Sequence, residues 1–485
     1  MKSKNLLRWQ AVILVVLWVI LNMLCLETWP NLMAFGDEAW FSDVAWNLAR
    51  GFRLANTMFP FTPLEKGLGL VAETFYYAPL ALIFKLAGVG LFQARFLSAV
   101  AAAASILILA YRMEETQAWI AIAFSPSLLI AAHTARPEAL GIMVLMVYLL
   151  LVISDKWVPV GILGGLSFLV SPVVGLWTSG AFFAWLMLSR GWKRRLGAAG
   201  FFALSFAAGL GLNALLGGAR IISYQGYTDY YVPLLYDQNP LFLFKAIAKK
   251  TYWFQLIRFR DPVITLLIAI AMISVAIRRF RLPREERMAW ASGAFGIILI
   301  GLGISRTPDY YFVYLLVPAA VACGLGLRKL RRGYGLVVFG LVGLAGLGKA
   351  LLNARALPRS QPPANITELR GHIPDDAGVI GPANLWYILY DKRLIVPLFG
   401  DLTRDKNEFL ARLDSLSPGF VILTDRDSSG WMWELASEGN PVCRMPFSGY
   451  IINTKTRCPE PVREIALYRL KPAESGAGRN KAGDR

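Results

Sequence analysis

The sequence predicts a polytopic α-helical membrane protein that ends in a small α/β domain. Of its 485 residues, 56% are hydrophobic and only 17% are charged, whereas an ordinary soluble protein carries about 25% charged residues. The net charge of +18 does not indicate nucleic-acid binding, because such a protein exposes its Lys and Arg among other polar residues. The high aromatic content excludes a disordered chain. The basic excess is instead expected in cytoplasmic loops.

The first apolar stretch, residues 9–26, follows the basic residues Lys2, Lys4 and Arg8. No small-residue cleavage site follows it, so we expect an uncleaved transmembrane helix and not a signal peptide. Because positive charges flanking a span stay in the cytoplasm, the N-terminus is predicted to be cytoplasmic.

Ten further apolar stretches approach the roughly 20 residues that cross a bilayer. With the first, they predict about eleven transmembrane helices. The ten stretches are residues 96–111, 118–132, 138–153, 158–170, 173–188, 196–216, 262–277, 288–304, 310–327 and 336–351. Within them, Gly161 and Gly165 and the series Gly340, Gly343 and Gly346 are of the small-residue type that lets helices approach closely.

Alternating these helices from a cytoplasmic N-terminus places three basic segments, residues 190–195, 278–287 and 328–332, in the cytoplasm. The short external turns carry one positive charge or none. This agreement with the positive-inside rule requires that the apolar stretch 76–91 does not cross the membrane. That stretch is short and contains Lys85, so we expect a re-entrant or interfacial helix.

The predicted topology has long external loops at about residues 27–95 and 217–261. Beyond residue 355 a Pro-rich linker leads into a segment of ordinary polar composition. We therefore expect a membrane domain at 1–355, an external α/β domain at 356–473 and a disordered tail at 474–485. Strands are predicted at 378–381, 394–398, 420–424 and 465–470, and a helix at 402–413.

Cysteine use agrees with this division. Cys25 and Cys323 fall in predicted spans and are expected to be inert core residues. Cys443 and Cys458 fall in the external domain, where an oxidising compartment would permit a disulfide between them. Two free thiols are the alternative.

The first external loop places Asp37 and Glu38 at the start of a predicted amphipathic helix. Over residues 38–50 the large apolar side chains share one helical face, which favours a helix lying on the membrane surface. Either carboxylate could simply cap this helix. Alternatively, one carboxylate is a general base, and the other orients the acceptor or holds a divalent cation.

The chain resembles the bacterial type C (GT-C) glycosyltransferases, the superfamily of protein O-mannosyltransferases and lipid A aminoarabinose transferases (glycosyltransferase families 39 and 83). The resemblance is clearest over residues 1–150 and continues mainly in the topology. It rests on Asp37-Glu38, Leu-Ala-Arg-Gly at 48–51, Tyr-Tyr-Ala-Pro-Leu at 76–80, and the segments 84–88 and 92–98.

The resemblance implies a GT-C fold and an inverting sugar transfer at the external face of the bacterial inner membrane. The donor would be a polyprenyl-phosphate sugar, the acceptor a lipid, a glycan or a protein, and the catalytic base Asp37. Because a lipid phosphate leaves, the site needs cations that stabilise its growing negative charge. The candidate cations are Arg95, Arg136, Lys66 and Arg306.

These candidates have structural alternatives. An arginine at the mouth of a span also snorkels to the interface without binding a ligand. An ion pair of Glu138 with Arg136 or with His133 would only fix the loop between two spans. Aromatic and polar side chains line sugar sites, but tyrosines also anchor spans at the interface. The candidate lining residues are His133, Glu138, Tyr76, Tyr77, Tyr227, Asp229, Tyr230 and Asp309.

Two other functions stay open. A lipid or glycan transporter or flippase would carry ionisable residues within its spans and show two related halves, whereas the predicted spans are nearly free of charge. A non-catalytic glycan-assembly protein would be expected to lack the acidic pair. With only His133 and His372 as histidines, a catalytic zinc site is not expected.

Overall fold

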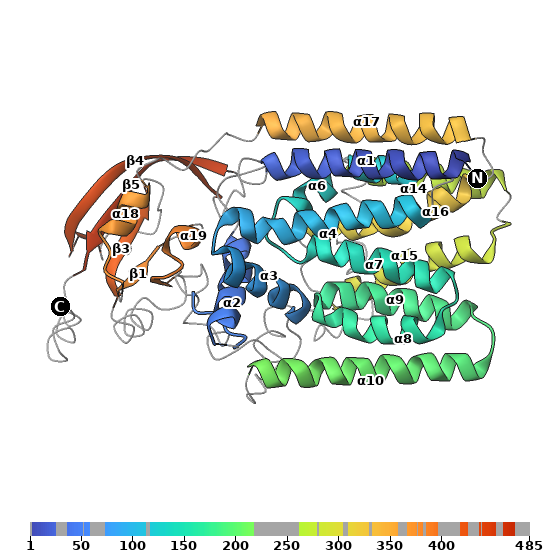
Figure 1. Cartoon of the computed structure of the whole chain (residues 1–485), viewed down its shortest axis with the longest axis horizontal. Coiled ribbons are helices and arrows are strands. Elements are labelled where there is room, and N and C mark those ends of the chain that lie inside the picture. Colours follow the sequence, from blue (N-terminus) through green and yellow to red (C-terminus); the bar gives the residue numbers. More distant parts are fainter. Residues whose placement is uncertain are drawn as a thin grey trace, which may run out of the picture.

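Most of the described chain is helical, and the long helices run side by side along the long axis of the molecule in the computed structural model (Figure 1). The structure describes residues 2–25, 36–51, 53–58, 73–112, 117–217, 261–278, 281–303, 309–328, 332–356, 366–375, 377–381, 385–395, 418–424, 436–437, 439–452 and 459–470.

Helices make up almost all of the described residues up to residue 356. They are α1 (Lys2–Cys25), α2 (Gly36–Gly51), α3 (Thr74–Ala87), α4 (Leu91–Arg112), α5 (Ala118–Ala123), α6 (Pro126–Ala132), α7 (Glu138–Ile153), α8 (Trp157–Leu166), α9 (Pro172–Leu188), α10 (Trp192–Gly217), α14 (Pro262–Ile277), α15 (Arg284–Gly303), α16 (Leu316–Gly326) and α17 (Arg332–Ala356), with the 3-10 helices η2 (Ser167–Leu169) and η3 (Asp309–Leu315).

Each predicted span coincides with one helix or with two helices in series. By length and composition alone, Leu91–Arg112, Trp192–Gly217 and Tyr334–Leu352 are long enough to cross a membrane, and most of the others are shorter apolar helices. Large apolar side chains such as Leu24, Leu215 and Leu341 are more than 60% exposed on α1, α10 and α17. Exposed apolar faces of this extent are typical of lipid contact, so the helical body is a membrane domain. The number of spans stays a prediction.

The predicted span 118–132 is not one continuous helix. Ser125 adopts an extended conformation and caps α6, and Pro126, which cannot donate a backbone hydrogen bond, occupies the first turn. The buried carboxylate of Asp261 accepts from Ser125 Oγ at 2.5 Å and from Ser127 N at 2.9 Å. It also caps α14 by accepting from Val263 N at 2.9 Å. Asp261, the residue that caps α14, therefore also binds the chain where it breaks between α5 and α6.

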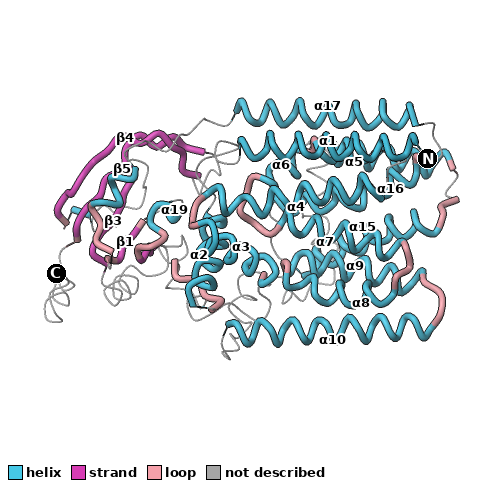
Figure 2. The backbone as a smooth tube through the Cα atoms, in the orientation of Figure 1, coloured by secondary structure: helices cyan, strands magenta, loops and turns pink. Residues whose placement is uncertain are grey.

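The strands form one five-stranded sheet at one end of the helical body, with order β2-β1-β3-β5-β4 (Figure 2). β1, β2 and β3 are parallel, whereas β5 is antiparallel to β3 and β4. Two short helices accompany the sheet, α18 (Ile366–Gly371) and α19 (Trp386–Leu389). The strands are β1 (Gly378–Ile380), β2 (Arg393–Ile395), β3 (Pro418–Thr424), β4 (Asn440–Ile452) and β5 (Pro459–Arg469).

The four predicted strands overlap β1, β2, β3 and β5, but β4 was not predicted. Its register shifts near Pro441 and again between Pro446 and Gly449, and such interruptions hide the alternating pattern of a strand. The predicted helix 402–413 and tail 474–485 lie outside the described residues. Cys443 is half-buried on β4, and Cys458 lies outside the described residues, so the predicted disulfide is not tested.

One buried apolar cluster joins the sheet to the helical body. It contains Val44 and Leu48 of α2, Phe84 of α3, Trp386 of α19 and Phe420 of β3. The predicted helices near 38–50 and 76–91 are present as α2 and α3. However, α2 is buried on more than its apolar face, because the polar residues Ser42 and Asp43 are also buried, with 0% and 3% exposed. The predicted helix is therefore present, but it packs against α3 and against α19, and its placement on the membrane surface stays a prediction.

Candidate active site

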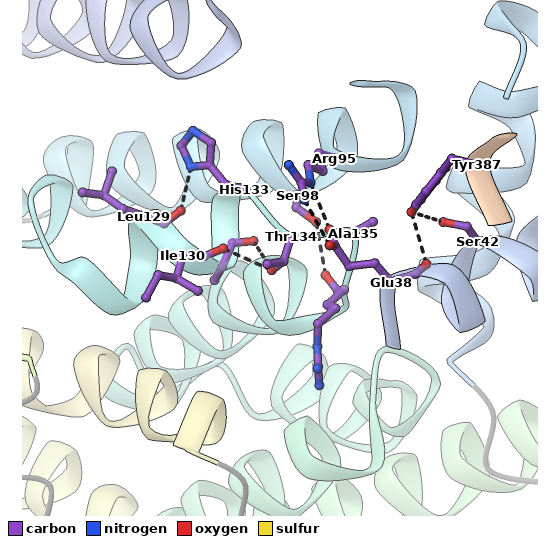
Figure 3. Close-up of polar contacts among 12 residues, drawn as sticks. Glu38, Ser42, Arg95, Ser98, Leu129, Ile130, His133, Thr134, Ala135 and Tyr387 are labelled. Carbon is purple, nitrogen blue, oxygen red and sulfur yellow. Dashed lines mark hydrogen bonds and ion pairs between the residues drawn. The ribbon is translucent and has the colours of Figure 1, made fainter. Parts of the chain in front are cut away.

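The N-terminal turn of α2 is fixed to the helical body through Glu38, whose side chain is fully buried. Arg95 of α4 donates from Nε to Oε1 at 3.0 Å and from Nη2 to Oε2 at 3.1 Å. The backbone N–H of Ala135 donates to Oε1 at 2.6 Å (Figure 3). A bidentate pair with an added backbone donor defines both the position and the orientation of the carboxylate. Glu38 is therefore an anchor between α2, α4 and the turn after α6.

That turn, residues 133–137, is shaped by side chains that replace helical hydrogen bonds. His133 Nδ1 donates to the Leu129 carbonyl oxygen at 2.7 Å. Ser98 Oγ of α4 donates to the Arg136 carbonyl oxygen at 3.2 Å. The orphan carbonyl groups at a helix end need such partners. Within this turn the backbone N–H of Ala135 donates to Glu38 of α2, whereas the N–H of Arg136 donates to the Thr134 carbonyl oxygen.

A second buried ion pair lies beside the first. Arg136 donates from Nε to Glu138 Oε2 at 3.1 Å and from Nη2 to Oε1 at 2.9 Å. Its guanidinium also lies over the ring of Phe41 of α2, 5.8 Å from the ring centroid, which is within the range of a cation–π contact. The loop-fixing Arg136–Glu138 pair, one of the two structural alternatives, is thus present.

Two tyrosines of α3 pack against the same part of α2. The Phe41 ring meets Tyr76 edge-on at 5.7 Å and lies 6.0 Å from Tyr77. Both tyrosines are buried. Burial raises the pKa of the Tyr76 hydroxyl well above its usual range, so this hydroxyl stays protonated. In the described chain these aromatic rings fill the contact between α2 and α3, and α3 packs in turn against α4.

Glu73, which precedes α3, is a titratable group that the sequence did not single out. Its Oε2 accepts from the Tyr77 hydroxyl at 3.0 Å. Burial raises the pKa of Glu73 to about 7, and the negative charge of Glu138 adds to this rise while Arg136 opposes it. Carboxyl groups with a raised pKa among charged neighbours are enriched at functional sites, so Glu73 joins the candidate site residues. Its only sequence signal was its position before a predicted helix.

The sheet end contributes two side chains from α19. Trp386 Nε1 donates to Asp43 Oδ1 at 3.1 Å. The Tyr387 hydroxyl donates to the Glu38 carbonyl oxygen at 3.2 Å and lies 2.7 Å from Ser42 Oγ. Burial raises the pKa of Asp43 to about 6, although hydrogen bonds from Thr57 and Trp386 lower it in part. The contacts of Trp386 and Tyr387 with α2 were not predicted, because they join positions more than 340 residues apart.

Comparison with known proteins identifies the fold. No protein-family model matches the chain, and no curated protein matches it. The crystal structure of ArnT from Cupriavidus metallidurans bound to undecaprenyl phosphate matches with a TM-score of 0.58 over 96% of this chain and 99% of ArnT, at 13% sequence identity. The chain has a GT-C glycosyltransferase-like fold.

Two further solved structures agree with this GT-C fold. ArnT in the apo state gives a TM-score of 0.58 at 11% identity, with 94% of this chain and 97% of ArnT covered. The cryo-EM structure of the arabinofuranosyltransferase AftD from Mycobacteria gives 0.52 at 15% identity, with 94% of this chain but 41% of AftD covered. The GT-C fold expected from the sequence is therefore confirmed.

Within this GT-C fold, seven of the predicted site residues come together at the sheet end of the helical body. They are Glu38, Arg95, His133, Arg136, Glu138, Tyr76 and Tyr77. Asp37 is the second residue of α2, directly before the anchored Glu38, and its side chain lies outside the described part. Asp309 opens η3, and its side chain also lies outside that part. Residues Lys66, Tyr227, Asp229, Tyr230 and Arg306 lie outside the described chain.

The described residues do not assemble a metal centre. No three side chains among the described His, Cys, Asp and Glu lie close enough to hold an ion. Glu38, the carboxylate left to hold a cation if Asp37 is the base, uses both oxygens to accept from Arg95 and Ala135. A divalent cation therefore finds no support in the part of the GT-C fold that the structure describes.

Proposed function

We propose that the protein is an inverting, membrane-embedded glycosyltransferase. It would move a sugar from a polyprenyl-phosphate donor to a lipid, glycan or protein acceptor at the external face of the bacterial inner membrane. The fold it shares with ArnT, which has been crystallised with undecaprenyl phosphate, supports this class of donor. The observation that carries the proposal is the anchored start of α2, which holds the residue next to Asp37 by three hydrogen bonds.

In this proposal Asp37 is the general base. It takes the proton from the acceptor hydroxyl while the acceptor oxygen attacks the anomeric carbon of the sugar, and the bond from that carbon to the phosphate oxygen breaks. The polyprenyl phosphate leaves with the electron pair, and the configuration inverts. A positioned base contributes about 10²- to 10⁴-fold to such a rate, provided that it is held in reach of the acceptor.

The growing charge on the leaving phosphate needs cations. Arg95 and Arg136 are each buried in a bidentate pair with a carboxylate, so binding of the phosphate by either would require one of these contacts to be exchanged. Lys66 and Arg306 complete the proposed set. The proposed topology places the N-terminus in the cytoplasm, and the sheet domain, residues 356–473, in the periplasm.

The test is transfer of a labelled sugar from polyprenyl-phosphate donors by purified full-length protein. We expect Asp37→Asn to lower kcat/KM by about 10²-fold or more at unchanged thermal stability. Glu464→Gln is the control, because Glu464 lies on the sheet surface and its side chain and that of its ion-pair partner Arg444 are 47% and 63% exposed. Wild-type activity in Asp37→Asn would remove Asp37 from the mechanism. A wild-type protein that transfers no sugar from any such donor, but moves the lipid across vesicles, would favour the transporter alternative.

A further inference from the structure

We infer that α19 of the sheet domain is a working part of the site, and that Tyr387 is a positioning residue for the proposed base. The inference rests on the proposed function, since it concerns how Asp37 is held. It assigns the sheet domain a role in the rate of the reaction in addition to any role in acceptor binding.

The first observation is the direction of the hydrogen bonds around Tyr387. Its hydroxyl donates to the Glu38 carbonyl oxygen at 3.2 Å. It lies 2.7 Å from Ser42 Oγ, one helical turn further along α2. With the tyrosine proton directed to the carbonyl, the serine hydroxyl donates to the tyrosine oxygen, and both groups are satisfied. Figure 3 shows Tyr387, Ser42 and Glu38 turned toward one another.

The second observation is that the neighbouring residue binds the neighbouring position. Trp386 Nε1 donates to Asp43 Oδ1 at 3.1 Å, and Trp386 is 1% exposed. The Asp43 carboxylate also accepts from Thr57 N at 2.6 Å and from Thr57 Oγ1 at 2.9 Å. Two consecutive residues of α19 thus hold Ser42 and Asp43, which are consecutive on α2.

The third observation is the packing beneath these hydrogen bonds. Trp386 lies against Phe84 of α3, with 6.4 Å between ring centroids. Tyr390, which follows α19, meets Trp46 of α2 edge-on at 5.5 Å. The fully buried Leu389 belongs to the same apolar cluster. Because separation would expose this cluster to water, α19 is a fixed neighbour of α2 and not a loosely attached module.

Together these contacts hold the start of α2 from two sides. Arg95 of α4 binds the Glu38 side chain, whereas Tyr387 binds the Glu38 main chain. Asp37 is the adjacent residue, so fixing the main chain of Glu38 also fixes the backbone position of Asp37. A misplacement of about 1 Å can cost about 10²-fold in rate. Loosening α2 would therefore lower kcat more than it raises KM for the donor.

Tyr387→Phe tests the inference, because it removes the hydroxyl and keeps the ring. We expect kcat to fall about tenfold while KM for the donor stays within about twofold. Ser42→Ala, which removes the other end of the same hydrogen bond, should change kcat in the same direction. Tyr390→Phe is the matched control, since its ring packs on Trp46 while its hydroxyl has no hydrogen bond to α2 in the described chain. It should keep both constants.

Hydrogen exchange supplies a readout that is independent of activity. In Tyr387→Phe, exchange over residues 36–51 should speed up, whereas exchange over α7 should not change. The inference would be overturned if Tyr387→Phe kept the wild-type kcat, or if the variant changed the exchange rate of residues 36–51 and of α7 to the same extent. If the wild-type protein transfers no sugar, the proposed function fails. Faster exchange confined to residues 36–51 would then still show that α19 holds α2 in place. Unchanged exchange over residues 36–51 would contradict that role of α19 as well.

Discussion

Arg95 and Glu38 form a bidentate ion pair in the interior, where their side chains are 1% and 0% exposed. The pair joins α4 to α2 across 57 positions of sequence. Removing two charges from water carries a desolvation cost that their attraction does not always offset, so such a pair is weak evidence for stability. Its consequence is geometric, because it allows only one placement of the α2 N-terminus against α4.

Breaking this pair from one side should destabilise the protein strongly. Glu38→Gln leaves the Arg95 charge buried without its counter-charge, and we expect a loss of about 3–5 kcal/mol in unfolding free energy. Denaturation of the purified protein in mixed micelles, followed by tryptophan fluorescence, measures this loss. The double variant Glu38→Leu/Arg95→Met should recover most of it, because it leaves no buried charge.

The more exposed pair of Arg370 and Asp391 provides a comparison. These side chains are 42% and 30% exposed, and exposed pairs contribute about 0–1 kcal/mol. Asp391→Asn should therefore change the unfolding free energy little. A Glu38→Gln variant that is no less stable than Asp391→Asn would contradict the role of Glu38 as an anchor.

The close approach of α8 and α10 predicts a contrast between two glycines. A Cβ atom added at Gly161 would lie 2.5 Å from the carbonyl oxygen of Ala198, a backbone atom that cannot move aside, whereas one added at Gly200 meets nothing within 4 Å. We expect Gly161→Ala to destabilise the bundle by about 1–3 kcal/mol. Gly200→Ala should be neutral or stabilise by up to about 1 kcal/mol. Thermal unfolding of both variants in one detergent decides the matter, and equal midpoints would refute the contact.

The buried carboxyl of Asp43 predicts that the contact between α19 and α2 depends on pH. Burial raises its pKa to about 6. A raised carboxyl pKa stabilises the folded state fully below about pH 4, and this contribution is lost as the pH rises through about 6. The groups that face Asp43 are Thr57, Trp386, Asn47 and the Met58 backbone, and none of them titrates in this range.

Exchange protection over residues 385–390, corrected for the intrinsic pH dependence, should therefore be greater at pH 5 than at pH 7.5. Asp43→Asn should abolish this step. It should also weaken the contact at both pH values, because an amide N–H replaces an oxygen that accepts from Thr57 N. An unchanged pH step in Asp43→Asn would assign the titration to another group.

The sequence was sufficient for features that depend on local pattern and composition. The length of the apolar stretches located the helices. The distribution of basic residues indicated that the stretch 76–91 should not be counted as a transmembrane span. Arg95, Arg136 and Glu138 were recognised together because each lies at the end of an apolar stretch. The glycine pattern was informative at Gly161, where α10 is close, but not at Gly340, which has nothing within 4 Å.

What the sequence could not supply is the choice of partners over long distances. Nothing near Arg95 shows that it binds Glu38, and nothing near Trp386 shows that it donates to Asp43. Those choices follow from how α2, α4 and α19 pack, which no local pattern records. The break at Ser125-Pro126 was not predicted, and its contact with Asp261 joins positions 136 residues apart.

The carboxyl group of Glu73 predicts that the stability of the candidate site depends on pH. Burial raises its pKa to about 7, so its stabilising contribution is complete below about pH 4.5 and is lost as the pH rises through 7. Glu73→Gln keeps an acceptor for the Tyr77 hydroxyl and removes the charge. We expect the variant to unfold at a higher temperature than wild type at pH 8, by on the order of 2–4 °C, and at the same temperature at pH 5. Glu464→Gln, on the sheet surface with 47% of its side chain exposed, should follow the wild-type pH profile. Parallel profiles for Glu73→Gln and wild type would show that Glu73 is not the group that titrates.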